Sequence, residues 1–298
     1  MSHGRVYTRD DLVNLRPRHT SFVGIDSDGC VFPTMEIKQK KCFHGLIVSQ
    51  WRLEPIEKQV REAAEFVNLY SKWRGCNRFI SLIRTFDLLL TRKDVVQSGV
   101  PIPRLGSLRR FIDSGVALGN PEIERAAKDS GDPDLAAVLK WSKDVNARIA
   151  KTVKQIAPFR WVHESLEKIQ AHSDAICVSQ TPTEALLREW EEHDITRFVH
   201  VIAGQELGSK AEHIALATKG KYPADRILMI GDAPGDLKAA QSNHAHFFPV
   251  NPTAEDKSWE RFAKEAYDKF LNGTYGGVYE QQLIKEFEAL LPETPPWA

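Results

Sequence analysis

The stretch Ser21–Val31 reads SFVGIDSDGCV and divides into an apolar half and an acidic half. Residues 22–25 are rich in β-formers and are followed by the turn signal DG, which predicts a short, buried, parallel strand ending in a loop. Asp26 and Asp28 therefore fall at the carboxyl end of the strand, the edge where open α/β sheets bind ligands. Two acids so close repel each other, so the pair calls for a cation or a shared proton.

A DxDG sequence on its own is also typical of a simple turn after a strand. The functional interpretation is favoured here because later predicted strands also end in polar residues. After residue 172, short apolar runs alternate with helix-length segments, a pattern that predicts right-handed crossovers and a parallel sheet. The later predicted strands are Ala175–Val178, Phe198–Ala203, Arg226–Ile230 and His246–Val250.

Two of the intervening helices begin with capping-box sequences. Thr181–Glu184 reads TPTE, with Pro182 at the first helical position, and Ser209–Glu212 reads SKAE. If Thr181 caps the first of these helices, the hydroxyl of Ser179 at the end of the second strand remains available to a ligand.

Lys210 and two further acids extend the pattern. Lys210 stands in the first turn of a helix, where the macrodipole disfavours a cation by a few tenths of a kcal/mol to about 1 kcal/mol. A nearby anion would explain it, although an exposed lysine tolerates that cost. Asp232 and Asp236 follow the fourth strand and could be a turn residue and a helix cap. They also place a carboxylate at the edge that Asp26 occupies, so four weak signals together indicate one polar site.

The order of these residues resembles the haloacid dehalogenase-like (HAD) hydrolase superfamily. Asp26-Ser27-Asp28-Gly29 is similar to its first motif, Ser179 to its second, Lys210 to its third, and Gly231-Asp232 through Asp236 to its fourth. Lys219 and Lys221 are rival candidates for the third motif, but they lie too close to the fourth strand for a helix to intervene.

The resemblance covers roughly residues 20 to 48 and 172 to 252 and implies an α/β fold. That fold is a Rossmann-like parallel five-stranded sheet core with an inserted all-helical cap domain. The segment between these parts shows helical spacing interrupted by Pro and Gly, without strand alternation, and it is larger than the compact four-helix caps common in the family. We therefore predict an N-terminal arm at 1–19, a catalytic core at 20–48 and 172–298, and a helical cap at 49–171.

The resemblance also implies a mechanism. Asp26 would attack phosphorus as the nucleophile and form an aspartyl-phosphate that water hydrolyses. Asp28 would protonate the leaving oxygen and then activate the water. Mg²⁺ would be held by the carboxylates of Asp26 and Asp232 and by the backbone carbonyl of Asp28.

The remaining motif residues would support this chemistry. Lys210 and Ser179 would bind the oxygens of the transferring phosphoryl group. Asp236 would orient Lys210 or a metal-bound water without touching the substrate. The expected protein is a Mg²⁺-dependent phosphohydrolase acting on a small phosphomonoester.

Other functions stay open to different degrees. Dehalogenases and phosphonatases that resemble this fold lack an acid two residues after the nucleophile, so Asp28 argues against both. A phosphomutase remains compatible because mutases with this type of cap keep both aspartates. A binding or regulatory protein with an idle site is a third interpretation, and the complete set of site residues argues against it.

Composition limits the partners and the compartment. Forty basic and forty acidic residues cancel, which gives no electrostatic case for nucleic acid or an anionic membrane. No apolar run of about 18 residues occurs, and the four cysteines match no zinc spacing. We expect a soluble cytoplasmic protein that takes a small phosphorylated metabolite; its oligomeric state cannot be read from the sequence.

One stretch of the predicted cap draws attention because it gathers cations at a bend. Residues 71–78 read SKWRGCNR, in which Gly and Asn are poor helix formers. Arg74, Asn77 and Arg78 are predicted to face the active site and to help set specificity when the cap closes. A solvated junction between two helices is the competing interpretation.

Overall fold

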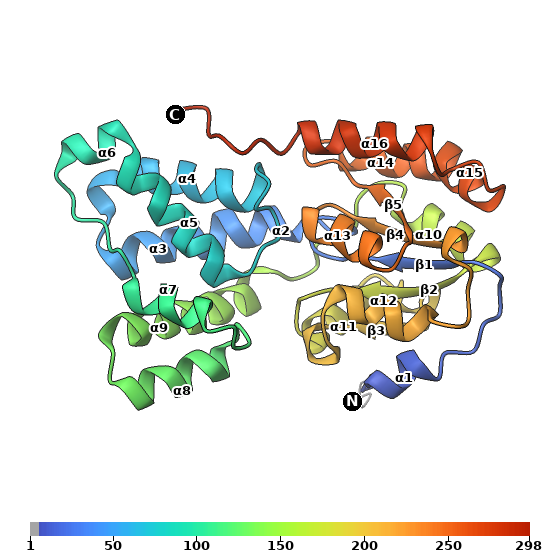
Figure 1. Ribbon diagram of the computed structural model, residues 1–298, viewed down its shortest axis with the longest axis horizontal. Coiled ribbons are helices and arrows are strands. Elements are labelled where there is room, and N and C mark those ends of the chain that lie inside the picture. The colour runs from blue at the N-terminus through green and yellow to red at the C-terminus, as the bar shows by residue number, and fades with distance from the viewer. Residues whose placement is uncertain (1–5) are drawn as a thin grey trace. The chain divides into compact units, whose positions relative to one another are not determined.

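The computed structural model describes residues 6–298, and contacts within it divide the chain into two compact units (Figure 1). An α/β unit takes the chain up to Met35 together with Gln155–Leu290. A helical unit comprises Glu36–Lys154 and the C-terminal segment Leu291–Ala298.

The α/β unit is built on a five-stranded parallel sheet in the order β3-β2-β1-β4-β5. In the central ladder Phe22 of β1 lies opposite Asp174 of β2 on one side and Ile227 of β4 on the other. The predicted sheet is therefore confirmed, although its third strand is shorter than predicted because residues 196–198 form a 3₁₀ turn. The strands are β1 Phe22–Ile25, β2 Asp174–Val178, β3 Val201–Ala203, β4 Ile227–Gly231 and β5 His246–Pro249.

The direction of winding reverses at β1. The chain moves outward from β1 to β2 and β3, then crosses back over β1 to β4 and β5. Because parallel crossovers are right-handed, the helices of the first two crossovers and those of the last two cover opposite faces of the sheet. Helices α10 (Val162–His172) and α11 (Thr183–Glu191) lie on one face, and α12 (Lys210–Thr218) packs beside α13 (Pro234–Ser242) on the other.

Segments at both ends of the chain complete this unit. Helix α1 (Arg9–Val13) packs on α12, with Leu12 fully buried and Arg9 donating to the Leu207 carbonyl at 2.8 Å. The predicted N-terminal arm therefore joins the α/β unit where it is described; residues 1–5 lie outside the described residues. The other elements here are η3 Thr196–Phe198, η4 Gln205–Leu207, η5 Ala224–Arg226, α14 Glu255–Arg261, η6 Phe262–Ala266, α15 Tyr267–Leu271 and α16 Val278–Ala289.

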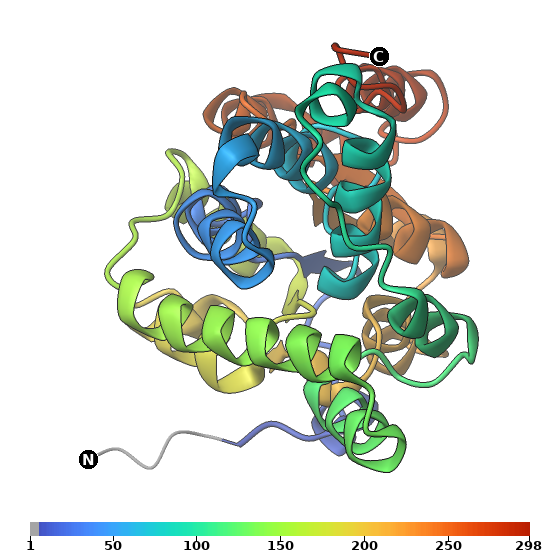
Figure 2. The same cartoon turned by 90° about the vertical axis from the view of Figure 1, so that its left-hand side faces the viewer.

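The helical unit is organised by an apolar core that includes Phe79, Phe86 and Trp141. Figure 2 shows its longest helix, α9, in green. Between Thr34 and Thr152 the described elements are α2 Thr34–Ile37, the π-helix η1 Lys38–Phe43, α3 His44–Trp51, η2 Glu54–Ile56, α4 Glu57–Leu69, α5 Arg78–Thr91, α6 Lys93–Ser98, α7 Gly106–Asp113, α8 Asn120–Ser130 and α9 Pro133–Thr152.

The observed limits of the helical unit differ from the predicted span 49–171. Both η1 and α3 pack against α4 and α9, so the unit begins at Glu36. At the other limit α10 packs on β2 and therefore belongs to the sheet. Helical periodicity alone could not separate these helices, because a helix that covers a sheet and one that packs on other helices show the same spacing.

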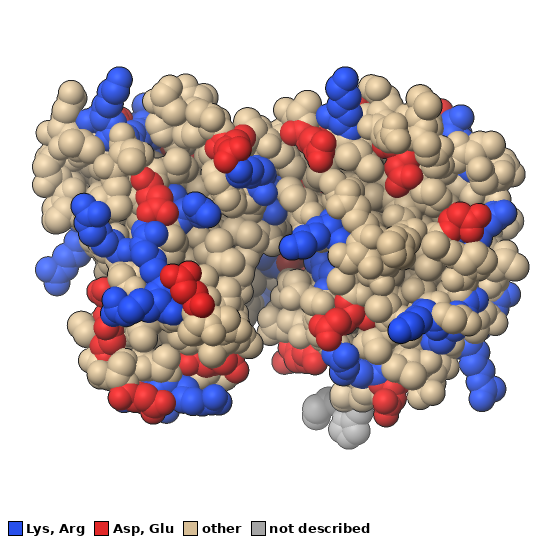
Figure 3. Space-filling view, in the orientation of Figure 1, with Lys and Arg blue, Asp and Glu red and all other residues tan. Residues whose placement is uncertain are grey.

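Charged side chains of both signs are interspersed over the face shown in Figure 3, as the equal numbers of basic and acidic residues predict. Among residues 6–298, no helix has both the length and the apolar character that a membrane crossing requires.

Candidate active site

The topology of the sheet brings two acids together. Asp26 follows β1 and Asp232 follows β4, and these strands are neighbours. The Asp26 backbone N–H donates to the Ile230 carbonyl at 2.9 Å, which continues the ladder to the site. The carboxyl ends of β1 and β4 form the point where the winding reverses, and ligands of open α/β sheets bind there.

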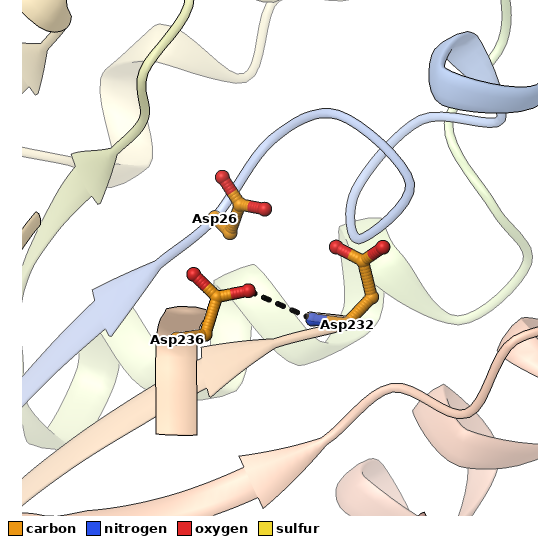
Figure 4. A group of neighbouring side chains, drawn as sticks. All are labelled: Asp26, Asp232 and Asp236. Atoms are coloured by element: carbon orange, nitrogen blue, oxygen red, sulfur yellow. Dashed lines mark hydrogen bonds between the residues drawn. The ribbon is translucent and has the colours of Figure 1, made fainter. Parts of the chain in front are cut away.

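A third carboxylate completes a buried cluster. Asp26, Asp232 and Asp236 each offer an oxygen, and these oxygens lie within 4.8 Å of one another. Figure 4 shows the three side chains converging from the ends of two strands and from the start of α13. All three residues are at most 3% exposed, so their charges need compensation from inside the protein or from a bound cation.

Asp236 is held in place through both of its carboxylate oxygens. Its Oδ2 accepts the backbone N–H groups of Asp232 at 3.2 Å and Ala233 at 3.0 Å, and its Oδ1 accepts Lys210. Gly231 permits this approach: a Cβ at that position would lie 2.4 Å from the Asp236 Cβ. The sequence showed this glycine only as part of a motif, because the close approach exists only in the folded chain.

Lys210 connects two of the acids. Its Nζ lies 3.0 Å from Asp26 Oδ1 and 2.5 Å from Asp236 Oδ1. Burial lowers the pKa of Lys210, but the charges of Asp236 and Asp26 outweigh it and raise the pKa above its ordinary value. Burial raises the pKa of Asp26, with Lys210 opposing and Asp236 and Asp232 reinforcing that shift. Lys210 is thus a fixed cation among the acids.

The local fold of α12 directs Lys210 to this place. The Ser209 side chain accepts the Glu212 backbone N–H and Glu212 accepts the Ser209 backbone N–H, so the predicted capping box is confirmed. Lys210 is the first residue of the helix. The anions that offset its unfavourable position at the helix N-terminus are supplied by other segments of the chain.

The loop after β1 is tightly folded around Ser27. The Ser27 carbonyl accepts the N–H groups of Cys30, Val31 and Phe32, and the Trp190 indole donates to Ser27 Oγ at 3.0 Å. Gly29 has a φ of 83°, a left-handed conformation that favours glycine. The loop therefore holds Asp28 on rigid backbone.

Two threonine hydroxyls donate hydrogen bonds to the Asp28 carboxylate. Thr34 donates to Oδ1, and Thr181 donates to Oδ2 at 2.6 Å. A hydroxyl can donate or accept, so this arrangement can orient the Asp28 carboxyl whether it is ionised or protonated. Sequence reasoning missed both threonines; Thr181 could have been found as a hydroxyl near a strand end, whereas Thr34 gave no signal.

Ser179 lies at the end of β2 and is almost fully buried. Its N–H donates to the Ala203 carbonyl at 2.9 Å and its Oγ accepts the Thr181 N–H at 3.2 Å. The predicted capping role of Thr181 is wrong, because α11 begins at Thr183 with Pro182 as its cap residue. Ser179 is therefore engaged as an acceptor, while its own proton can still reach a ligand.

The donor set fits a hard divalent cation. The cluster offers only carboxylate oxygens, which Mg²⁺ prefers, and it is confined to one buried point. Both carboxylate oxygens of Asp236 already accept hydrogen bonds, from Lys210 and from backbone N–H groups. Asp26 and Asp232 are therefore the members best suited to hold the ion.

The three residues predicted to contribute from the cap have partners within the helical unit. Arg74 is buried and donates to the Leu69 carbonyl at 2.8 Å. The Asn77 side chain accepts the Phe79 N–H and donates to the Leu118 carbonyl. Arg78 Nη1 donates to Ser142 and to Asn146 Oδ1. These contacts give each residue a packing role, and their part in specificity stays a prediction.

No protein-family model and no curated protein sequence matches the chain. Among solved structures, it is similar to a HAD-like family hydrolase from Streptococcus pneumoniae (15% identity, 80% of this chain and 90% of that one, TM-score 0.41). It is also similar to a candidate HAD-hydrolase from Bacillus subtilis bound to magnesium (12%, 79% and 89%, TM-score 0.42). A third is a candidate beta-phosphoglucomutase from Bacteroides vulgatus (14%, 97% and 92%, TM-score 0.43). At these TM-scores and identities, the functional proposal rests on the side chains of the site.

Proposed function

We propose that the protein is a Mg²⁺-dependent phosphohydrolase that acts on a small phosphomonoester through an aspartyl-phosphate. The observation that carries this proposal is the buried carboxylate cluster with Lys210 bound to two of its members, at the reversal point of a parallel sheet. A structural salt bridge would need one acid for one lysine. This site gathers three acids around one lysine, which suits a second cation and a phosphoryl anion.

Asp26 is the proposed nucleophile. One of its oxygens contacts Lys210, so the carboxylate is oriented before substrate arrives. Attack on phosphorus forms a bond from Asp26 to the phosphoryl group and breaks the bond to the leaving alkoxide. Water then cleaves the aspartyl-phosphate and releases inorganic phosphate.

Asp28 is the proposed general acid and base. The two threonine hydroxyls keep its carboxyl in one orientation, as proton transfer to the leaving oxygen requires. After giving up that proton, Asp28 can accept one from the attacking water. Both transfers use the same positioned group, so no further acid is needed.

Lys210 and Ser179 are proposed to bind the phosphoryl oxygens. The lysine charge is already in place, and the Ser179 hydroxyl proton is available for a hydrogen bond. Asp236 is proposed to hold Lys210 in this position without contacting substrate. When bound by Asp26, Asp232 and the Asp28 carbonyl, Mg²⁺ would neutralise carboxylate charge and polarise the phosphoryl group.

A phosphate-release assay over a panel of phosphomonoesters tests this proposal. We expect Mg²⁺-dependent release of inorganic phosphate from at least one sugar phosphate, nucleotide or generic aryl phosphate. Conversion of a substrate to a phosphorylated isomer without phosphate release would assign a phosphomutase instead. No turnover of any compound, with and without Mg²⁺, would favour an idle binding protein. A cytoplasmic location and a phosphorylated metabolite as partner belong to the same proposal.

A further inference from the structure

A polar cavity lies at the edge of the sheet opposite the candidate active site. Its volume is about 490 Å³, within the range of small-molecule sites. Residues that lead into three strands line it: Ser173 and His200 directly precede β2 and β3, and His19 lies in the short segment before β1. Because the strands are parallel, their amino ends share one edge, and the acids of the candidate active site occupy the other.

The wall of this cavity is organised by Asp174, the first residue of β2, which is fully buried. Its Oδ2 accepts the backbone N–H groups of Arg18 and His19, both at 2.9 Å, and the Tyr222 hydroxyl at 2.9 Å. Its Oδ1 lies 2.8 Å from His200 Nε2. Burial raises the pKa of Asp174, but these hydrogen bonds outweigh it and lower the pKa to about 2. Asp174 thus fixes three cavity-lining residues through hydrogen bonds to both of its carboxylate oxygens.

The lining carries a cation that the fold itself does not use. The backbone of Arg18 and His19 is held by Asp174, yet within residues 6–298 neither side chain makes a hydrogen bond or ion pair. Arg197 also lines the cavity, but it is already paired with Asp194 and stacks on Phe198. Arg18 is therefore the guanidinium available to an anionic ligand, with His19 beside it.

Polar groups around this cation narrow the class of ligand. Glu191, an exposed carboxylate, lines the same cavity and would repel a second anionic group while accepting hydrogen bonds from hydroxyls. Gln170 and Thr196 add further hydrogen-bonding groups. A ligand that joins one phosphate to a hydroxylated body matches this set, and the cavity has room for one of nucleotide size.

We propose that this cavity binds a hydroxyl-bearing phosphomonoester, a sugar phosphate or mononucleotide, as a second ligand distinct from the substrate. Arg18 and His19 bind the phosphate, and Glu191 accepts from the hydroxyls. Strand β2 runs directly from Ser173 at the cavity to Ser179 at the candidate active site. The site is independent of the proposed chemistry, because none of its lining residues belongs to the acid cluster.

Calorimetric titration of the full chain tests the proposal, with AMP and ribose 5-phosphate as probes and adenosine as the uncharged control. The Asp26→Asn variant in EDTA prevents turnover during the titration. We expect both phosphorylated probes to bind and adenosine to bind at least about tenfold more weakly, the loss of one charge-assisted contact. On that background Arg18→Gln should weaken probe binding by about tenfold or more. Arg16→Gln, an exposed arginine outside the lining, is the matched control and should leave binding unchanged.

Three results would overturn the proposal. The first is the absence of binding by either phosphorylated probe at millimolar concentration. The second is binding that Arg18→Gln leaves unchanged but Lys210→Met abolishes, which would place the probe at the acid cluster. The third is binding of citrate in preference to both probes, which would reject the phosphate class. Circular dichroism of Arg18→Gln confirms folding, since the contact of this residue with Asp174 uses only the backbone.

Discussion

The α/β unit and the helical unit bury charged groups in different ways. In the α/β unit, Asp26, Asp232, Asp236 and Lys210 come from distant segments and meet at one sheet edge. In the helical unit, the buried Arg74 donates a hydrogen bond to the nearby Leu69 carbonyl, and the core itself is apolar. A parallel sheet collects side chains at its edge by topology, whereas packed helices use polar contacts mainly to fix one another.

The nucleophile should give the largest effect. Asp26→Asn keeps the shape of the side chain but removes the charge that would attack phosphorus. We expect kcat to fall by at least about 10³-fold in a phosphate-release assay, while circular dichroism remains that of the wild type. Near-normal turnover would mean that the acid cluster is structural and that the contrast between the two units is not a functional one.

Removal of the metal should have the next largest effect on activity. EDTA should abolish phosphate release and added Mg²⁺ should restore it, because the cluster offers only oxygen ligands. Asp232→Ala should abolish activity or raise the Mg²⁺ concentration needed for half-maximal rate. Full activity of a metal-stripped sample, verified by elemental analysis, would reject the assignment of the cluster as a metal site.

A pair of glycines tests how tightly the site is packed. At Gly231 a Cβ would meet Asp236 at 2.4 Å, whereas at Gly235 in α13 it would meet nothing within 4 Å. We expect Gly231→Ala to lower the free energy of unfolding by about 1–3 kcal/mol and to reduce kcat by displacing Asp236. Gly235→Ala should change stability by less than about 1 kcal/mol. Equal effects in urea titrations would show that the close approach of Asp236 is not what restricts Gly231.

Arg78 tests whether the helical unit also contributes to function. Arg78→Ala removes the contacts with Ser142 and Asn146 that connect α5 to α9. The free energy of unfolding should therefore fall by roughly 1–3 kcal/mol, and the melting temperature should fall with it. If Arg78 also sets specificity, kcat/KM should drop more for a large substrate than for a small aryl phosphate. Ser142→Ala is the control, since it removes one acceptor and keeps the guanidinium. Equal discrimination by both variants and the wild type would leave Arg78 a packing residue only.

Two buried histidines, one in each unit, should give the smallest effect. Burial lowers the pKa of His44 to about 3 and that of His213 to about 4. Below pH 6.5 the unfolded chain takes up protons that the folded chain refuses. Stability is therefore intact above pH 6.5 and is lost as pH falls, by roughly 1 kcal/mol per pH unit for each histidine, until the folded pKa is reached. When the free energy of unfolding is measured by urea titration between pH 7 and pH 5, it should depend less on pH in His44→Leu and in His213→Leu than in the wild type. An unchanged pH dependence in the double variant would contradict this cause.

The sequence by itself predicted the parts of the fold that local patterns encode. Short apolar runs alternating with helices predicted a five-stranded parallel sheet, and the order of Asp26, Ser179, Lys210 and Asp232 predicted one site at its edge. Strand periodicity and crossover handedness need no knowledge of side-chain packing, which is why the sheet was predicted correctly, whereas the functional roles of these four residues stay predictions. The Ser209–Glu212 capping box succeeded for the same reason, because its hydrogen bonds span only three residues.

Tertiary structure decided what depends on contacts between distant residues. Thr181 binds Asp28, and Asp174 shapes the polar cavity, through contacts between segments far apart in the sequence. The contact of Thr34 with Asp28 and the need for glycine at position 231 are more local, but they appear only once the loops are folded. The wrong prediction of a helix cap at Thr181 has the same origin. A capping-box sequence indicates only a local preference, and in the folded chain the Thr181 hydroxyl donates to the Asp28 carboxylate instead. A local preference of about 1 kcal/mol is outweighed by a buried, charge-assisted hydrogen bond. Such bonds join distant residues, so they cannot be predicted from the local sequence.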